Sequence, residues 1–240
     1  MVPARTLALA VGATLGVVLA APPVQAAPDG SNTNRWRTHL GAELGSWVRQ
    51  TPWPRLAGGV TGSRDHFGFI GLRRLQLHTG LGRGFRDRFV AGLRLDYEIS
   101  RGIQRSLDPG AEARAITVSA MPYLTVMFDD KNVVRPYVSV HAGLGGGLLT
   151  ILDPSPLDRP ERSSSLLFPV AGLDLGAHAF VSPNVSLDGT VTVDHRWEYL
   201  RGTTPSTVPE GTAQFRAEAG HGSFNRRFVA SIGLAVSRWF

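Results

Sequence analysis

A regular alternation of apolar and polar residues recurs along this chain, and it is clearest between Phe89 and Ile99. Apolar residues take the odd positions of this segment, whereas Arg94, Asp96 and Glu98 fall on even positions. A helix repeats every 3.6 residues and would scatter these charges over all of its faces, whereas a strand places them on one face. The segment is therefore predicted to be a β-strand with one apolar and one polar face.

Seven further segments show the same alternation, although one of them is irregular. They lie around residues 39–44, 67–79, 116–126, 137–143, 171–178, 185–194 and 227–237. The connections between the segments alternate between long ones, at 49–66, 100–112, 150–165 and 200–222, and short ones, at 81–87, 129–133 and 181–184. An even number of strands joined in this way is typical of an up-and-down barrel in the bacterial outer membrane. The sequence thus predicts an all-β fold over residues 36–240, an eight-stranded antiparallel transmembrane β-barrel.

Two irregularities interrupt this pattern. The adjacent Arg73 and Arg74 break the alternation within 67–79, which indicates a β-bulge. Pro122 lies inside the strand expected at 116–126, where a residue without an N–H cannot donate to a neighbouring strand.

The first 26 residues have the pattern of a secretory signal peptide. Arg5 provides the positive charge, residues 7–21 form an apolar stretch, and Val24-Gln25-Ala26 ends in the small residue that cleavage requires. The apolar stretch is shorter than the roughly 20 residues of a membrane-spanning helix. We therefore expect export, a short periplasmic tail at 27–35, and a barrel with both termini in the periplasm.

Composition excludes several classes of function. The chain has no cysteine, which removes disulfides and thiolate chemistry. Its net charge is +6, and all of its 25 basic residues except Lys131 are arginines. These arginines are interspersed with acidic residues and form no basic stripe, so nucleic acid is not an expected partner.

Alternation alone does not separate a membrane barrel from a soluble one, such as a secreted lipocalin-like barrel that binds an apolar ligand. The aromatic residues favour the membrane barrel, because most of them fall near strand ends, where two girdles would lie at the headgroup level. The girdle near the short turns would contain Trp36, Phe89, Phe128, Tyr137, Phe180, Trp239 and Phe240. The girdle near the long loops would contain Trp47, Phe67, Phe69, Tyr97, Phe168, Trp197, Tyr199, Phe224 and Phe228.

Two stretches carry a resemblance to a known family. The ending RFVASIGLAVSRWF, from Arg227 to Phe240, and the stretch RPYVSVHAGLGGG from Arg135 resemble strands of small bacterial outer-membrane β-barrel proteins of the eight-stranded OmpA/OmpX type. The resemblance implies contact with outer-membrane lipid and lipopolysaccharide, and insertion by the barrel-assembly machinery, with Phe240 as the assembly signal. Arg238 departs from the pattern, since the family usually has an apolar or aromatic residue there; its side chain could reach lipid phosphate.

No catalytic, cofactor or metal site is predicted. Ser139 and His141 have the two-residue spacing of an outer-membrane lipid A hydrolase, but in reversed order and on the expected lumen face. The histidines expected in the lumen lie on different strands, and the glycines of 143–147 lack the lysine and helix of a phosphate loop. A lipid A-modifying enzyme of the acyl hydrolase or transferase type is kept as an alternative function.

The remaining candidate site is a set of charged residues on the lumen face. Eight strands enclose an interior that side chains can fill, so charges there are expected to pair with one another. The set consists of Glu43, Arg94, Asp96, Glu98, Asp194, Arg196, Glu198 and Arg227, with Arg73 or Arg74 as a further cation. The predicted function is a structural or surface-interaction role carried by the long loops, with a lumen plugged by ion pairs.

Overall fold

A computed structural model of the chain describes residues 34–53, 64–69, 74–86, 88–103, 112–128, 132–152, 162–202 and 223–240. All of the regular structure in these ranges is β-strand. The strands are β1 (Trp36–Trp53), β2 (Arg64–Phe69), β3 (Arg74–Phe85), β4 (Phe89–Ile103), β5 (Glu112–Met127), β6 (Val134–Leu152), β7 (Arg162–Ser182), β8 (Val185–Gly202) and β9 (Ser223–Trp239). The expected signal peptide and most of the residues of the long connections lie outside the described ranges.

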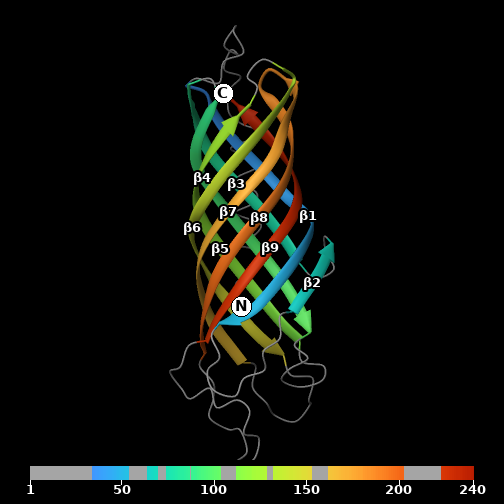
Figure 1. Cartoon of the computed structure of the whole chain (residues 1–240), viewed down its shortest axis with the longest axis vertical. Helices are drawn as coiled ribbons and strands as arrows, with labels where there is room; N and C mark the ends of the chain where they lie inside the picture. The colour runs from blue at the N-terminus through green and yellow to red at the C-terminus, as the bar shows by residue number, and fades with distance from the viewer. Residues whose placement is uncertain are drawn as a thin grey trace, which may run out of the picture.

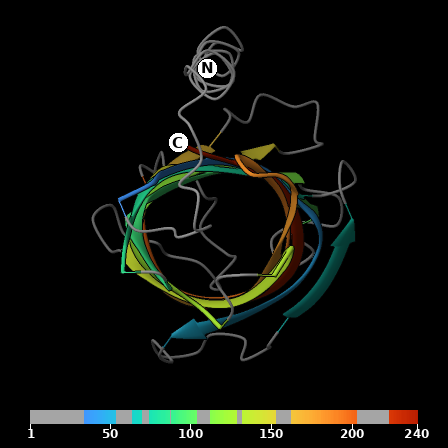
Figure 2. The same ribbon diagram turned by 90° about the horizontal axis from the view of Figure 1, so that it is seen from above.

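Eight of these strands close into a barrel. From β3 to β9 each strand pairs with the next in antiparallel register, and β1 lies between β3 and β9. The ladder between β1 and β9 runs from Arg37↔Trp239 to Trp53↔Phe224 and completes the ring, which is seen along its axis in Figure 2. The predicted fold class, an antiparallel up-and-down β-barrel, is confirmed.

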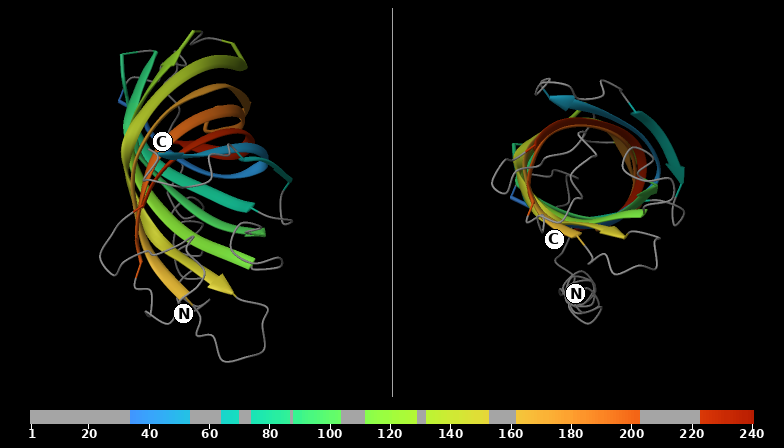
Figure 3. Two further views of the ribbon diagram at one scale, coloured as in Figure 1. Left: turned by 60° about the horizontal axis from the view of Figure 1, so that its bottom comes forward. Right: turned by 90° about the horizontal axis from the view of Figure 1, so that it is seen from below.

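The two ends of the barrel differ in their connections (Figures 1 and 3). The turns between β3 and β4, β5 and β6, and β7 and β8 are short, and β1 begins and β9 ends at this same end. We call it the turn end, and the opposite end the loop end. The observed turns agree with the short connections predicted from the sequence, whereas the strands extend further into the predicted long connections.

The irregular segment at 67–79 forms two separate strands. β2 pairs with the loop-end part of β1, at Gly45–Gln50, and β3 pairs with the turn-end part, at Trp36–Ala42. Ala42 of β1 is paired with Leu77 of β3, and Gly45 of β1 is paired with Phe69 of β2. Ala42 and Gly45 are three residues apart in the sequence, whereas Phe69 and Leu77 are eight residues apart. β2 lies outside the ring in Figure 2. Arg73, where we expected a bulge, is outside the described residues.

Pro122 lies where the pairing of β5 with β6 is interrupted. The β5–β6 ladder pairs Ala120 with Leu144 and Tyr123 with His141, but it contains no pair for Met121 or Pro122. On the other side, Pro122 is paired with Leu93 of β4. The missing N–H thus falls at a gap in one ladder, which explains how a proline is accommodated inside a barrel wall.

The polarity of the barrel is the reverse of that of a soluble protein. Large apolar side chains on the outer face are exposed, for example Leu144 (65%) and Ile232 (58%), whereas Arg196 and Asp194 inside are 2% and 1% exposed. An exposed apolar exterior around a charged interior is the arrangement of a barrel surrounded by lipid. Among the described residues, no helix is long and apolar enough to cross a membrane.

The aromatic residues form a less complete pair of girdles than we expected. Trp36, Phe128 and Trp197 lie on the outer face and are 40–60% exposed. Four other members of the expected girdles lie on the lumen side instead, because strand alternation places them on the same face as the charged residues. These are Tyr137, Phe168, Phe180 and Trp239. Proximity to a strand end was therefore insufficient evidence for a position at the headgroups.

The outer face can be tested by arginine substitution at two depths. Leu93 is the fifth residue of β4 counted from the turn end, whereas Val134 begins β6 at that end, and both are about half exposed. We expect Leu93→Arg to lower the free energy of unfolding in lipid vesicles by about 2–4 kcal/mol and Val134→Arg by about 0–1 kcal/mol. Urea titration of the folded band on a gel measures both. Equal losses would show that this face does not span the hydrocarbon layer.

Candidate functional site in the charged lumen

Glu98 of β4 is the centre of the ion-pair network nearest the loop end. Its Oε2 lies 2.6 Å from Nη1 of Arg196 on β8 and 3.1 Å from Nη2 of Arg74 on β3. Its Oε1 lies 2.7 Å from Nη2 of Arg227 on β9. β4 is not adjacent to β8 or β9 in the sheet, so these two contacts cross the interior of the barrel.

Two more carboxylates balance the three arginines. Arg74 also contacts Glu43 of β1 at 2.8 Å, and Arg227 contacts Glu198 of β8 at 3.4 Å. Three arginines thus face three glutamates, and the outermost network is neutral as a group. The neutrality matters because an unpaired charge in a confined interior is costly.

A second network surrounds Arg94 at the middle of the barrel. Its guanidinium binds both carboxylate oxygens of Asp96 on its own strand, at 2.6 and 2.9 Å, and lies 3.3 Å from Asp174 on β7. His141 of β6 joins this group, since Nε2 lies 2.8 Å from Asp194 and Nδ1 lies 3.3 Å from Asp174. Both ring nitrogens therefore face a carboxylate, and the ring donates to both only when it carries both protons.

A third group surrounds Asp188 near the turn end. This carboxylate accepts hydrogen bonds from Arg37 at 3.0 Å, from Ser186 at 2.7 Å and from Ser237, and it lies 2.7 Å from Nδ1 of His178. The His178 ring stacks on Tyr137 with a centroid distance of 4.4 Å, and Trp239 packs edge-on against it. The aromatic side chains that were expected at the lipid surface instead fill the lumen around this carboxylate.

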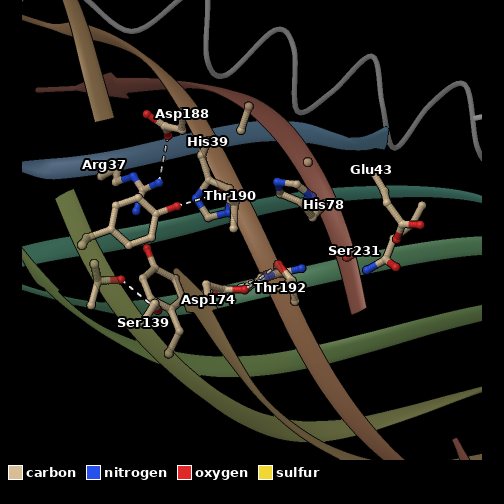
Figure 4. A pocket seen from close by; sticks show the side chains of 17 residues that line it. Arg37, His39, Glu43, His78, Ser139, Asp174, Asp188, Thr190, Thr192 and Ser231 are labelled. Atoms are coloured by element: carbon tan, nitrogen blue, oxygen red, sulfur yellow. Dashed lines mark hydrogen bonds and ion pairs between the residues drawn. The ribbon is translucent and has the colours of Figure 1, made fainter. Parts of the chain in front are cut away.

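Between the second and third groups lies a small cavity (Figure 4). Arg37, Asp188, His39 and His78 are among the side chains that line it, together with hydroxyl groups from β5, β6 and β8. Its volume is about 40 Å³ measured as the space open to water centres, which is room for a few water molecules. The cavity is polar, and it is much smaller than the pockets that hold drug-sized ligands.

The described residues contain no group of three or more histidine or acidic side chains that could hold a metal ion. His39 and His78 lie near each other, with ring centroids 5.8 Å apart. His141 and His178 lie in the separate groups around Asp174 and Asp188. The four histidines are thus distributed over different levels of the lumen.

Ser139 and His141, the two residues considered for hydrolysis, are not bonded to each other. The hydroxyl of Ser139 accepts a hydrogen bond from Thr125 at 3.0 Å, whereas His141 faces two aspartates. Both side chains are buried inside the barrel, on the side away from the apolar outer surface. A nucleophile needs a base within hydrogen-bond reach, and this pair does not provide one.

The structure places all eight predicted ion-pair residues in the lumen, and Arg74 is the additional cation. Arg94 and Arg196 each contact an aspartate on their own strand, and their other carboxylate partners lie across the barrel. The sequence-based set missed several members of these groups, which strand parity alone identifies. These are Arg37, Gln76, His141, Asp174, His178 and Asp188.

Glycines give the large lumen side chains their space. A Cβ at Gly172 of β7 would lie 2.3 Å from Oδ1 of Asp194 and 2.4 Å from Nε2 of His141, which are the two atoms of the shortest contact made by His141. Only glycine lets these two side chains meet over β7.

Solved structures with a similar fold are outer-membrane proteins. Neisserial surface protein A is 12% identical over 85% of this chain and 97% of its own, with a TM-score of 0.46. OprG of Pseudomonas aeruginosa is 13% identical over 87% of this chain and 98% of its own, with a TM-score of 0.44. OmpT, an outer-membrane protease of Escherichia coli, is 7% identical over 87% of this chain and 97% of its own, also with a TM-score of 0.44.

The fold is identified by three features of this structure: eight strands in the ring, closure between β1 and β9, and an apolar exterior around a charged interior. This chain has the fold of a small outer-membrane β-barrel. No protein-family model matches it, and no curated protein matches it. The likenesses to solved structures concern the fold alone, so the role of the barrel has to be argued from its own lumen and surface.

Removal of the central carboxylate tests the network at the loop end. Glu98→Gln leaves three arginines without their shared charge, and we expect the free energy of unfolding to fall by about 3–5 kcal/mol, as when a buried ion pair loses one partner. Glu198→Gln is the matched control, because Arg227 keeps Glu98; we expect a loss of about 1.5 kcal/mol. Equal losses in urea unfolding would contradict the central position of Glu98.

A pair of glycine substitutions tests the packing of the middle network. Gly172→Ala is expected to separate His141 from Asp194 and to cost about 1–3 kcal/mol, as overpacked cores do. Gly189→Ala on β8 is the control, because a Cβ there has no neighbour within 4 Å; we expect a change within about 0.5 kcal/mol. Thermal unfolding of both variants measures these changes. If Gly172→Ala leaves the stability unchanged, the side chains around Gly172 can move to make room for a methyl group.

Proposed function

We propose that this protein is an outer-membrane barrel with a structural or surface-interaction role, whose lumen is closed to solutes by its ion pairs. The observation that carries the proposal is the contact of Glu98 with Arg196 and Arg227 across the interior, at 2.6 and 2.7 Å. These contacts join opposite walls, so a solute that enters from the loop end meets bonded side chains rather than water.

Two further levels support closure of the lumen. Arg94 joins β4 to Asp174 of β7, and Arg37 joins β1 to Asp188 of β8. The cavity between these levels has room for only a few waters. A solute would have to separate ion pairs at each level in turn, and each separated pair leaves buried charges without partners.

With the lumen closed, recognition would depend on the long loops. The strand ends that flank the connections 49–66, 100–112, 150–165 and 200–222 all lie at the loop end. On this proposal the loop end faces the cell exterior, both termini are periplasmic, and outer-membrane lipid and lipopolysaccharide surround the barrel. Insertion by the barrel-assembly machinery, with Phe240 as part of its signal, belongs to the same proposal.

The alternatives find less support in the geometry. A lipid A-modifying enzyme would need a nucleophile and base within reach of acyl chains, whereas Ser139 and His141 face inward and have other partners. A secreted lipocalin-like barrel would need an apolar interior for its ligand and a polar exterior, and this barrel has the opposite distribution. Buried apolar residues of the described lumen pack into two separate clusters, one of which consists of Met121, Leu166, Phe168 and Val170.

Electrical recording tests closure directly. We expect wild-type protein in a planar lipid bilayer to show no current or rare small openings, because the ion pairs bridge the lumen. The double variant Glu98→Ala/Arg196→Ala removes a contact across the interior and should open more often, whereas Arg101→Ala, an exposed arginine near the loop end of β4, should behave as wild type.

The control measurement is heat-modifiable gel mobility, which reports whether each variant is folded before recording. Steady currents on the nanosiemens scale of wide porins from the folded wild type would overturn the closed lumen. Fractionation that leaves the protein soluble, away from the outer membrane, would overturn the membrane location as well.

A further inference from the structure

Two histidines on neighbouring strands lie close together on the wall of the lumen cavity (Figure 4). They are His39 of β1 and His78 of β3, and their ring centres are 5.8 Å apart. Each ring covers a glycine of the opposite strand: a Cβ at Gly80 would collide with His39, and a Cβ at Gly41 would collide with His78. Both imidazoles are therefore packed closely against the backbone of the opposite strand.

Neither of these rings is bonded to an acidic side chain. His141 and His178, which also face the lumen, each contact an aspartate at 2.7–2.8 Å. By contrast, Nδ1 of His39 is buried without a partner, and no hydrogen bond or ion pair joins the ring of His39 or His78 to another described residue. A proton on either ring would create a buried charge without a partner, so the pair is uncharged while the lumen is closed.

Charged groups on four strands face the pair. Those of the described residues are Arg37 and Glu43 of β1, Arg94 and Asp96 of β4, Asp174 of β7 and Asp188 of β8. β5 and β6 contribute Tyr123 and Tyr137, and the side chains of β9 that line the cavity carry no charge. Each of the four carboxylates already forms an ion pair with an arginine, at distances between 2.6 and 3.3 Å.

Proton uptake by the pair would disturb this balance. An imidazole in water takes up a proton at about pH 6.5. A protonated His39 or His78 would face two guanidiniums and the second ring, and it would have no carboxylate of its own. It would either stay unpaired or draw an aspartate away from Arg94, and both outcomes leave a buried charge without a partner in the middle of the lumen.

The pair lies where the wall of the barrel is least extensively bonded. The ladder between β1 and β3 runs from Trp36↔Arg83 to Ala42↔Leu77, and it is the shortest in the ring among the described residues. Beyond Ala42, β1 is paired with β2, which lies outside the ring. Repulsion between two charged rings would therefore act where few backbone hydrogen bonds oppose the separation of the strands.

We propose that His39 and His78 form an acid-sensitive switch, and that proton uptake by this pair opens the closed lumen. At neutral pH the uncharged rings pack against the two glycines and the ion pairs remain joined. In mild acid the charged rings repel each other and the two guanidiniums, and water enters the cavity to solvate them. The proposal rests on the closed lumen proposed above and adds the condition under which it opens.

Recording in a planar lipid bilayer between about pH 7 and pH 5 tests the switch, because this range lies above the pH at which ordinary carboxylates take up protons. The open state binds more protons than the closed state, so acid favours opening, by about tenfold per pH unit for each proton taken up. We expect the open fraction of the wild type to rise by at least about tenfold per pH unit. His39→Gln/His78→Gln should remove most of this rise. His195→Gln is the matched control, because His195 lies on the outer face between the inward Asp194 and Arg196, and it should respond to acid as the wild type does.

His78→Gln alone keeps one of the two rings and should give a smaller rise than the wild type. Heat-modifiable gel mobility shows that each variant is folded before recording. A double variant that opens in acid as readily as the wild type, or a His195→Gln variant that loses the response equally, would overturn the switch. A wild type that stays closed at both ends of the pH range would overturn the switch and leave the closed lumen standing. Steady currents of the nanosiemens scale already at neutral pH would overturn the closed lumen itself.

Discussion

The narrowness of an eight-stranded barrel is the constraint on which the rest of this structure depends. The interior of such a barrel is just wide enough to be filled by side chains, so a charge placed there meets other side chains rather than bulk water. Isolated buried charges are too costly to persist. Strand alternation sends Arg94, Asp96 and Glu98 inward together, and the barrel is stable only because other strands supply Asp174, Arg74, Arg196 and Arg227 at matching heights.

The same narrowness explains the glycines of the lumen face. Two large side chains on neighbouring strands would collide at this diameter, so a large residue faces a residue without a side chain. His39 lies over Gly80 and His78 lies over Gly41, each at a distance that a Cβ would not permit. The lumen networks thus depend on the placing of glycines opposite large side chains as much as on charge. Substitution of a lumen glycine should therefore disturb ion pairs between the neighbouring side chains.

The period of two and the positions of turns made the fold predictable from the sequence. These are local properties of the chain, and the observed turns lie where alternation stops. The register between strands is not local, which is why the cross-barrel partners of Arg94 and Arg196 were not predicted. The separation of β2 from β3 was also missed, because adjacent arginines indicate a break in alternation but not its size. Tyr137 and Trp239 were misplaced for a different reason: their parity was readable, and nearness to a strand end was given more weight than it deserved.

Arginines on the inward and outward faces of the strands find their partners in different places. Inward arginines find carboxylates on other strands because the ring brings every strand to the lumen, as Arg37 finds Asp188. Outward arginines have only two neighbouring strands, and at the turn end Arg83 reaches a neutral asparagine and a tryptophan ring. The ion-paired lumen and the exposed arginines Arg83, Arg86 and Arg88 of the outer rim are thus two consequences of the same geometry.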